Sequence, residues 1–372
     1  MNQFTISCPC LFGLEGILAD EIKRMGGQNV AAQNGRVLFE GTAQDVARAN
    51  LNLRTAERVL IVLGSFRALS FEDLFQGVLK LSLEAFIGKK DAFPVKGWSL
   101  NSKLHSVPDC QSIIKKAAVK RLEQAYRQSW FEETGPVHQI QFSILKDEVT
   151  VMLDTSGAGL HKRGYRKDSN EAPIKETLAA GILDIARVKG YSVVYDPFCG
   201  SGTFLIESAL RALRIAPGLS RRFSAESWGC FDRTIWQQER DRAIAQIDRS
   251  VPFEAHGADI SKDAVDLTLS NAKKAGVADR IHAKVADIKH FCVTHEKATV
   301  VCNPPYGERL LDIEQSEKLY GVMGKVFEKR DGLSYYIISP HEEFERLFGR
   351  PADKRRKLYN GMIKCQLYMY FR

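Results

Sequence analysis

The sequence predicts an α/β fold in which a mostly parallel sheet ends in an antiparallel hairpin and is preceded by two smaller α+β units. Apolar, strand-like runs alternate with helical runs from residue 193 to 339, a pattern typical of parallel sheets. Near the end of the chain, Asn360-Gly361 separates two strand-like runs, 354–359 and 362–371, and this pair fits a type I′ hairpin turn. A parallel series that ends in a hairpin is unlike a plain dinucleotide-binding fold.

The first 63 residues predict a small α+β unit. Strands are expected at the segment FTISC, at 36–39 and at 57–63, and helices at 14–25 and 43–51. This stretch contains no constellation of acid–base or metal-ligating residues. We therefore interpret it as an accessory module.

Residues 64–156 predict a second α+β unit with a basic helix. Helices are expected at 71–86 and 112–130, and strands at 93–100, 139–145 and 148–153. In the second helix an apolar stripe leaves Lys116, Lys120 and Arg121 on other faces. These cations could contact phosphate or simply solvate the helix.

A cationic loop follows at residues 161–167, where Tyr165 is interleaved among Lys162, Arg163 and Arg166. Cations with an aromatic ring suit phosphate binding and base stacking, although a charged linker is the alternative. A helix is then expected from residue 172 to 188, with Pro173 near its first turn.

The segment VVYDPFCGSGTFLIE, residues 193–207, predicts a strand, a tight turn and a helix. Gly200 and Gly202 allow close backbone approach to a ligand, and the helix start offers free N–H donors. Asp196 at the strand end would repel phosphate but could hold an ammonium or hydroxyl group. The turn is neither a Walker A motif nor a complete dinucleotide fingerprint. Taken alone, it could be purely structural.

Two further strands are expected to end at carboxylates. After a polar helical insertion at 214–250, the strand 253–260 ends at Asp259, and after a helix at 262–275 the strand 281–286 is followed by Asp287. These carboxylates could accept hydrogen bonds from ribose hydroxyls and from an adenine amine. Each could instead serve only to start a helix.

The next strand, 298–302, is followed by Asn303, Pro304, Pro305 and Tyr306. The prolines end the strand and stiffen the loop, so that the Asn303 amide and the Pro304 carbonyl are fixed acceptors beside an aromatic face. That arrangement suits an exocyclic amine on a base, although turn formation alone is the alternative. A helix at 313–329 and a strand at 334–339 complete the series.

The motifs DPFCGSGTF and NPPYGER together resemble those of class I S-adenosylmethionine-dependent methyltransferases, specifically the THUMP-domain RNA guanine-N2 methyltransferases. The segment FPVKGWSLNSKLHSVPDCQSIIKKAAVKRL resembles the THUMP domain itself. The resemblance covers almost the whole chain. It implies a ferredoxin-like module at 1–63, a THUMP RNA-binding domain at 64–156, and a class I, Rossmann-like methyltransferase domain with a seven-stranded sheet at 157–372.

The resemblance also implies a cofactor, S-adenosylmethionine, and a set of site residues. The expected catalytic residues are Asn303, Pro304, Pro305 and Tyr306. The expected cofactor-binding residues are Pro173, Thr177, Asp196, Phe198, Gly200, Gly202, Thr203, Asp259, Ile260, Asp287 and Ile288. The expected RNA-binding residues are Lys116, Lys120, Arg121, Lys162, Arg163 and Arg166.

Composition limits the remaining possibilities. The 53 basic and 45 acidic residues give a net charge of +8, which favours anionic partners. The eight cysteines include no C-x-x-C pair, so no metal is expected, and no apolar run is long enough to span a bilayer. A cytoplasmic location is therefore expected.

The resemblance implies that the substrate is the N2 amine of a guanine in large-subunit ribosomal RNA. Several alternatives remain open. Adenine N6 in RNA and guanine N2 in transfer RNA are the nearest, because both offer the same N–H donors. A non-catalytic RNA-binding protein would not need Asn303-Pro304-Pro305-Tyr306, and a nucleotide-dependent oxidoreductase would need the third glycine that is missing.

Overall fold

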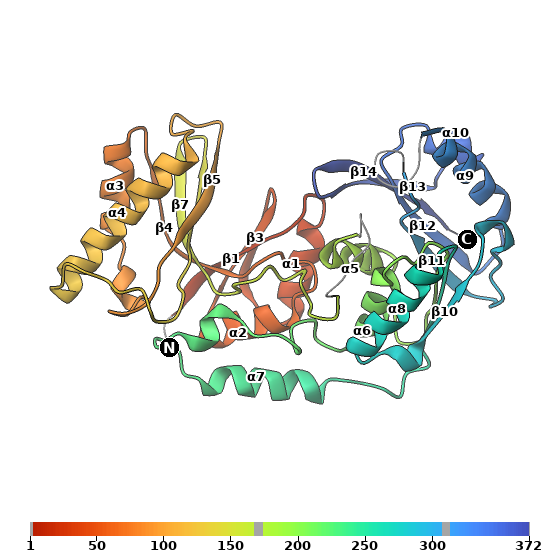
Figure 1. The fold of residues 1–372 in the computed structure, drawn as a ribbon, viewed down its shortest axis with the longest axis horizontal. Coiled ribbons are helices and arrows are strands. Elements are labelled where there is room, and N and C mark those ends of the chain that lie inside the picture. Colours follow the sequence, from red (N-terminus) through yellow and green to blue (C-terminus); the bar gives the residue numbers. More distant parts are fainter. Residues whose placement is uncertain (1–2, 167–173, 307–312, 372) are drawn as a thin grey trace.

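The computed structural model of the chain describes residues 3–166, 174–306 and 313–371. Within these ranges the strands form two seven-stranded sheets, one in each half of the chain. In Figure 1 the first sheet occupies the left and centre and the second lies on the right. The predicted order, α+β units followed by an α/β unit, is confirmed.

The first sheet is continuous across the first two expected modules, with the strand order β2-β3-β1-β4-β7-β6-β5. In β4, Ile61 lies opposite Ile6 of β1 and Leu153 of β7. The expected boundary between residues 63 and 64 thus falls inside β4. The strands are β1 (Phe4–Pro9), β2 (Gln28–Gln33), β3 (Arg36–Gly41), β4 (Leu60–Arg67), β5 (Val95–Leu100), β6 (Ile140–Leu145) and β7 (Glu148–Asp154).

The helices of this half differ from expectation mainly at their ends. They are α1 (Glu15–Arg24), α2 (Ala43–Asn52), α3 (Phe71–Leu79) and α4 (Val107–Tyr126), with a short 3₁₀ helix η1 (Leu83–Ala85). The helix expected over 71–86 is interrupted because the Leu81 N–H donates to the Val78 carbonyl, a tight bond typical of helix ends. Helix α4 begins earlier than expected, with Pro108 in its first turn.

The second sheet has the order β10-β9-β8-β11-β12-β14-β13. Neighbours from β10 to β12 pair in parallel, whereas β14 is antiparallel to β12 and β13. Its strands are β8 (Val193–Asp196), β9 (Glu254–Asp259), β10 (Ile281–Val285), β11 (Ala298–Cys302), β12 (Leu333–Ser339), β13 (Lys354–Asn360) and β14 (Ile363–Tyr370). The mostly parallel sheet with a terminal hairpin is as predicted.

The helices of this half are α5 (Glu176–Ile185), α6 (Thr203–Ala212), α7 (Thr234–Ala245), α8 (Lys262–Lys274), α9 (Ile313–Val326) and α10 (Phe344–Phe348). Short 3₁₀ helices are η2 (Ser224–Ser227), η3 (Ala278–Arg280) and η4 (Ile288–His290). Helix α10 and strand β2 were not predicted. Helix α10 has only five residues, too few to show a helical repeat, and β2 is mostly exposed and so lacks the apolar alternation of a half-buried strand.

The hairpin turn lies one residue later than expected. Asn360 pairs with Ile363, so the two turn residues are Gly361 and Met362. Gly361 has a φ of 66°, whereas Asn360 and Met362 do not have positive φ. A positive φ at the first turn residue alone is the requirement of a type II′ turn, so the expected type I′ turn at Asn360-Gly361 is wrong.

The insertion at 214–250 returns to the N-terminal half of the molecule. Helix α7 packs along α2, as Figure 1 shows beneath the centre of the fold. Trp228 and Trp236 are buried in the hydrophobic core of the first sheet, and the Trp228 indole donates to the Val137 carbonyl at 3.0 Å. The insertion therefore connects the two halves.

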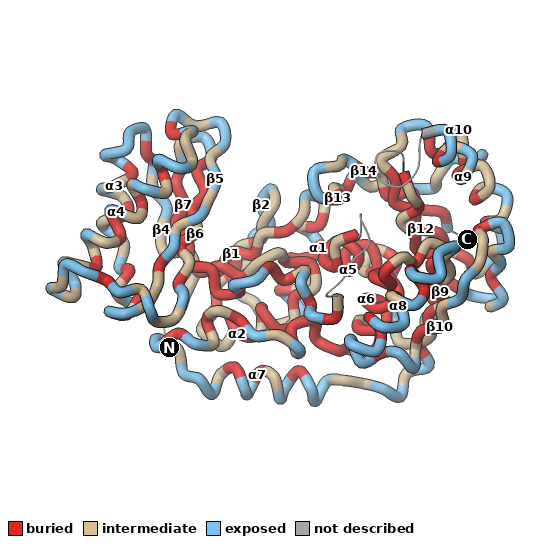
Figure 2. Tube along the Cα trace, viewed as in Figure 1, coloured by how far each residue is buried: buried red, intermediate tan, exposed pale blue. Residues whose placement is uncertain are grey.

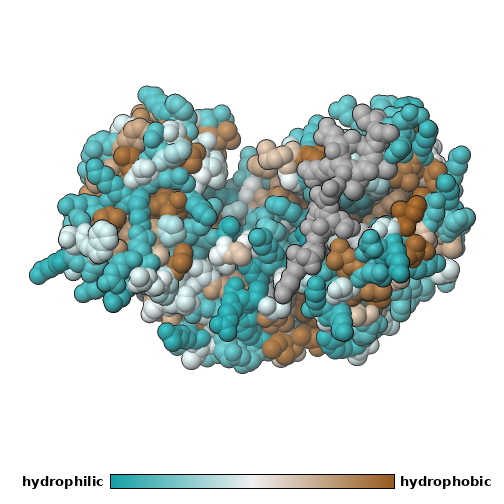
Figure 3. Space-filling view, viewed as in Figure 1, coloured by the Kyte–Doolittle hydropathy of each residue, from teal (hydrophilic) through white to brown (hydrophobic). Residues whose placement is uncertain are grey.

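Buried residues follow the strands and the inward faces of the helices in both halves (Figure 2). Hydrophilic side chains cover much of the face shown in Figure 3. None of the helices in the described ranges combines the length and apolar character needed to cross a bilayer.

Candidate active site

A cavity of about 860 Å³ lies at the carboxyl ends of β8, β9, β10 and β11. Ligands of open parallel sheets bind at this edge, because the loops after adjacent strands converge there. Ten of the predicted catalytic and cofactor-binding residues line the cavity: Asp196, Phe198, Gly200, Thr203, Asp259, Ile260, Asp287, Ile288, Asn303 and Pro305. Segments more than 100 residues apart in the sequence therefore meet at one place.

The turn between β8 and α6 depends on its two glycines. Gly200 and Gly202 have φ values of 52° and 81°, which L side chains rarely adopt. A Cβ atom on Gly202 would also lie 2.8 Å from the Thr268 methyl carbon. Gly202 thus shapes the turn from behind and is not itself part of the cavity lining.

Asp196 is a buried carboxyl group at the end of β8, and it is only 2% exposed. Burial, together with the nearby charge of Asp259, raises its pKa to about 8, although the Phe198 N–H donates to Oδ1 at 3.0 Å and opposes the shift. A buried carboxyl group of this kind becomes charged most readily when a cation binds beside it. The site therefore favours a ligand with an ammonium group.

Asp259 connects two loops of the cavity wall. Its Oδ2 accepts from the Gly200 N–H and its Oδ1 from the Ser261 N–H, both at 3.0 Å. These bonds fix the carboxylate while each oxygen retains a second lone pair for a ligand hydroxyl. Asp259 is thus both a helix-entry residue and an accessible acceptor.

Asp287 caps η4 by accepting from the Lys289 N–H at 2.9 Å. The hydrogen bond from Lys289 lowers the pKa of Asp287, so this carboxylate is charged in the cavity wall. Beside it, Ile288 is 9% exposed and Ile260 is 74% exposed. A carboxylate acceptor and two apolar side chains in the same cavity wall suit the edge and faces of an adenine ring.

Asn303 stands at the end of β11, and its Oδ1 is buried without a hydrogen-bond donor among the described residues. Leaving such an acceptor unsatisfied costs about 1–3 kcal/mol. Buried acceptors without a donor are found at binding sites, where the ligand supplies the missing hydrogen bond. Asn303 and Pro305 line the cavity, so such a ligand would approach Oδ1 from there.

Three other predicted residues lie outside the lining. Tyr306 is 7% exposed and its hydroxyl accepts from the Asn360 amide at 3.2 Å, so the expected open stacking face is not seen. Thr177 is buried and its hydroxyl donates to Glu57 of the N-terminal module, which explains why it does not reach the cavity. Pro304 is buried. Pro173 lies outside the described residues.

Sequence reasoning missed the contribution of helix α9. Gln315, Lys318, Leu319 and Val322 line the cavity from this helix, and Ile174, Pro197 and Ser261 line it from loops. The spacing of the α9 residues, three or four apart, was the available signal, because such residues share one helix face.

The predicted RNA-binding cations fall into two groups. Lys116 and Lys162 are exposed and form no ion pair with another described residue. Lys120 pairs with Glu123 at 3.2 Å, and Arg121 makes a bidentate pair with Glu84. These pairs lie on the surface, so their cations stay near solvent.

Arg163 and Arg166 are engaged in internal contacts. Arg163 is 3% exposed, lies 3.4 Å from Glu207 and donates to the Leu160 and Arg54 carbonyls. A buried guanidinium cannot contact an RNA phosphate directly, so the expectation that Arg163 binds RNA is wrong. Arg166 bonds Glu176 at 3.0 Å and Thr203 at 3.1 Å, next to the cavity.

Comparison with known families divides the chain into three matches. Residues 5–60 match the RlmL ferredoxin-like domain, residues 68–154 the THUMP domain, and residues 163–369 the RMKL-like methyltransferase domain.

Two relatives differ in length. The putative RNA methyltransferase YpsC of Bacillus subtilis is 40% identical, and the match covers 100% of this chain and 97% of that protein. The ribosomal RNA large subunit methyltransferase K/L of Psychromonas ingrahamii is 35% identical over 97% of this chain but only 49% of that protein. The chain thus spans about half the length of the K/L protein.

Two solved structures share the whole architecture. The putative methyltransferase SMU.472, crystallised with SAH, is 39% identical with a TM-score of 0.94, covering 100% of this chain and 98% of that one. A predicted N6-adenine-specific DNA methylase from Listeria monocytogenes is 42% identical with a TM-score of 0.94, covering 100% and 97%.

Proposed function

Because the chain belongs to the RMKL-like methyltransferase family, whose cofactor is S-adenosylmethionine, we propose that it methylates the exocyclic N2 amine of a guanine in ribosomal RNA. The relatives named as ribosomal RNA large subunit methyltransferases support the ribosomal substrate. The chemistry of Asn303 supports an exocyclic amine as the target, and the choice of guanine N2 rests on the resemblance of the motifs DPFCGSGTF and NPPYGER to those of RNA guanine-N2 methyltransferases.

The described residues fit this cofactor. The Asp196 carboxyl would hold the ammonium group, Asp259 the ribose hydroxyls, and Asp287 with Ile288 the adenine, in a cavity of about 860 Å³ that suits a ligand of this size. When bound, S-adenosylmethionine supplies an electrophilic methyl group on a sulfonium.

The observation that carries the proposal is that Asn303 Oδ1 is buried without a hydrogen-bond donor from any described residue. An exocyclic amine has two N–H donors. Oδ1 would accept one of them, and the backbone carbonyl of Pro304, whose side chain is buried outside the lining, would accept the other. Both bonds would turn the nitrogen lone pair toward the cavity and remove its delocalisation into the ring, which favours attack. The amine proton can leave after transfer, so no dedicated base is required.

Adenine N6 is the second candidate, because the structural neighbour from Listeria monocytogenes is named as a predicted adenine-specific methylase. Adenine N6 also offers two N–H donors to the same acceptors. The THUMP match at residues 68–154 favours RNA over DNA for this chain.

The test is to methylate unmodified ribosomal RNA and unmodified transfer RNA with labelled S-adenosylmethionine, and then to digest each RNA to nucleosides. We expect label in N2-methylguanosine from ribosomal RNA. Label only in N6-methyladenosine would overturn the assignment of the base, and label only from transfer RNA would overturn the assignment of the substrate. RNA binding without any transfer would favour the non-catalytic alternative.

A further inference from the structure

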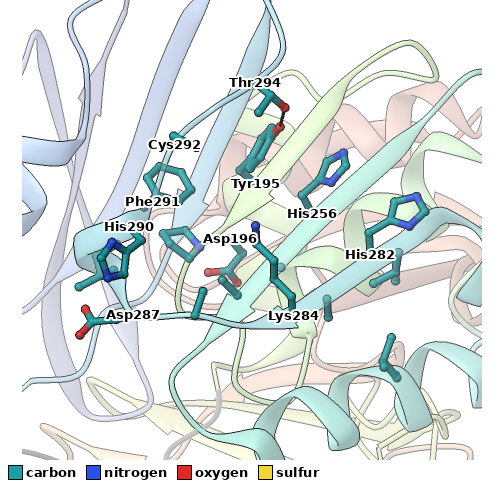
Figure 4. A pocket seen from close by; sticks show the side chains of 18 residues that line it. Tyr195, Asp196, His256, His282, Lys284, Asp287, His290, Phe291, Cys292 and Thr294 are labelled. Atoms are coloured by element: carbon teal, nitrogen blue, oxygen red, sulfur yellow. Dashed lines mark hydrogen bonds between the residues drawn. The ribbon is translucent and has the colours of Figure 1, made fainter.

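A second cavity of about 440 Å³ adjoins the first on the second sheet. It shares Asp196, Asp287 and Ile288 with the first cavity and is also lined by Tyr195 of β8, His256 of β9, His282 of β10 and the segment after η4. Figure 4 shows His256 between Tyr195 and His282, on neighbouring strands. Tyr195, His256 and His282 have no part in the proposed methyl transfer.

Three potential metal ligands meet beside this cavity. Glu254 and His256 are two residues apart in β9, so their side chains lie on the same face of the sheet. His295 reaches them from the loop before β11, with its Nε2 2.7 Å from Glu254 Oε1. His256 Nε2 lies 3.5 Å from Glu254 Oε2, and all three ligand atoms are within 4.8 Å of one another.

One ring nitrogen of this cluster lacks a hydrogen bond, and another has a partner that could orient its ring. The Nε2 atom of His256 is buried, yet it makes no hydrogen bond within the described part of the chain. The other ring nitrogen of His295, Nδ1, lies 2.7 Å from the Tyr195 hydroxyl. If a metal ion took the place of the Nε2 proton that faces Glu254, a hydrogen bond from Nδ1–H to the Tyr195 hydroxyl would hold the ring, as second-shell partners of metal-bound histidines do.

We propose that Glu254, His256 and His295 bind a divalent transition-metal ion, with Zn²⁺ as the preferred ion. Two imidazoles and one carboxylate form a known zinc ligand set, which leaves a fourth position for water. Metal–ligand bonds of about 2.0–2.1 Å in a tetrahedron place ligand atoms roughly 3.4 Å apart. The present separations bracket that value, and the half-buried side chains need only small shifts.

The charge of the cluster suits metal binding. Because the carboxylate supplies a negative charge, the cluster as a whole attracts a cation.

The site lies away from the methyl-transfer centre. Glu254 begins β9 and Asp259 ends it, a distance of roughly 16 Å along a strand. A metal here would tie β9 to the loop before β11 and hold Tyr195, the residue before Asp196. We therefore assign it a structural role.

The test is a titration of the chelator-treated full chain with Zn²⁺, followed by calorimetry and by the shift in melting temperature. We expect one equivalent to bind and the melting temperature to rise. His256→Ala and His295→Ala should each weaken binding at least tenfold. Co²⁺ substitution should give the visible spectrum of nitrogen and oxygen ligands without a thiolate charge-transfer band.

Two control variants define the site. His341 and Glu317, 3.5 Å apart, form a similar histidine–carboxylate pair away from the proposed site. The His341→Ala variant should therefore still bind one equivalent of Zn²⁺. Cys292 lines the cavity and is exposed, so Cys292→Ser tests a cysteine contribution and should also leave binding intact. Binding of SAH by each variant checks its fold.

Failure of the wild-type chain to bind Zn²⁺ would overturn the proposal. The proposal would also be wrong if the His256→Ala and His295→Ala variants bound SAH and kept the Zn²⁺ affinity of the wild type, or if Cys292→Ser no longer bound Zn²⁺.

Discussion

At the scale of single residues, the site separates groups that hold the cofactor from a group that meets the substrate. Asp196, Asp259 and Asp287 follow β8, β9 and β10 and are positioned by backbone N–H donors. Asn303 follows β11, and within the described ranges its Oδ1 has no hydrogen-bond donor. Removing Asn303 should therefore affect transfer and cofactor binding differently.

We predict that Asn303→Ala abolishes methyl transfer while the affinity for SAH changes by less than about twofold. The amide would touch the reacting base rather than the adenosine, so its loss acts on the transition state. Single-turnover rates and calorimetry with SAH measure the two effects. Equal losses of rate and SAH affinity would show that Asn303 holds the cofactor. Asp259→Ala is the matched comparison, with an expected loss of about 1–3 kcal/mol in SAH binding.

The raised pKa of Asp196 predicts how stability depends on pH. An unfolded aspartate titrates near a pKa of about 3.9, whereas burial raises that of folded Asp196 to about 8. Between these values the folded chain binds more protons, so its stability falls as pH rises, by at most about 1.4 kcal/mol per pH unit.

Asp196→Asn should consequently melt at a higher temperature than the wild type near pH 8 without ligand, and at the same temperature near pH 4. Calorimetric scans at both pH values measure this. Asp248→Asn is a control of opposite sign, because hydrogen bonds from Ser250 lower the pKa of exposed Asp248. If the melting temperatures of Asp196→Asn and the wild type differed by the same amount at both pH values, the pKa of Asp196 would not be raised in the folded chain.

Residues that follow strands could be predicted from the sequence, whereas residues placed by packing could not. Asp196, Asp259, Asp287 and Asn303 each stand at or just after the end of a predicted strand, and parallel strands bring such positions to one edge. The burial of Arg163 and the bond from Thr177 to Glu57 depend on contacts between modules. No local pattern encodes such contacts.

At the scale of elements, α7 and α2 illustrate a contact that periodicity did not indicate. Glu239 of α7 is 1% exposed and accepts from Arg48 Nε and Nη2, both at 2.9 Å, and from Gln44 at 2.8 Å. The insertion appeared polar in the sequence because these groups are charged. Inside the molecule they satisfy one another.

Arg48→Ala should lower the free energy of unfolding by about 1–3 kcal/mol, because it leaves the buried Glu239 carboxylate without its main partner. The melting temperature should fall, and limited proteolysis should cut first around residues 246–250, beyond α7. Replacing the exposed pair of Arg346 and Glu343 is the control, since such surface pairs contribute little. Equal melting temperatures for the two variants would contradict a stabilising role for the α2–α7 contact.

At the scale of the whole molecule, hydrogen bonds join the N-terminal module to the methyltransferase domain. Burial would raise the pKa of Glu57, but hydrogen bonds from His161 and Thr177 and the charge of Lys175 lower it to about 2. The Arg54 guanidinium donates to the Ile215 and Leu210 carbonyls. These contacts hold the THUMP-bearing half and the cavity in one arrangement, so an RNA could engage both.

Among the cations predicted to bind RNA, Lys116 and Lys162 are exposed and form no ion pair with other described residues. Each phosphate contact to single-stranded RNA releases a counterion and adds about 0.7 to the slope of log affinity against log salt. Lys116→Gln with Lys162→Gln should therefore reduce the slope by roughly 1.4, with similar losses for different RNA sequences. Binding titrations over a salt series measure it. Lys120→Gln with Arg121→Gln, whose cations pair with Glu123 and Glu84, is the control and should change the slope less. A wild-type slope in the first variant would mean that Lys116 and Lys162 only solvate the surface, and the RNA path would have to be sought elsewhere.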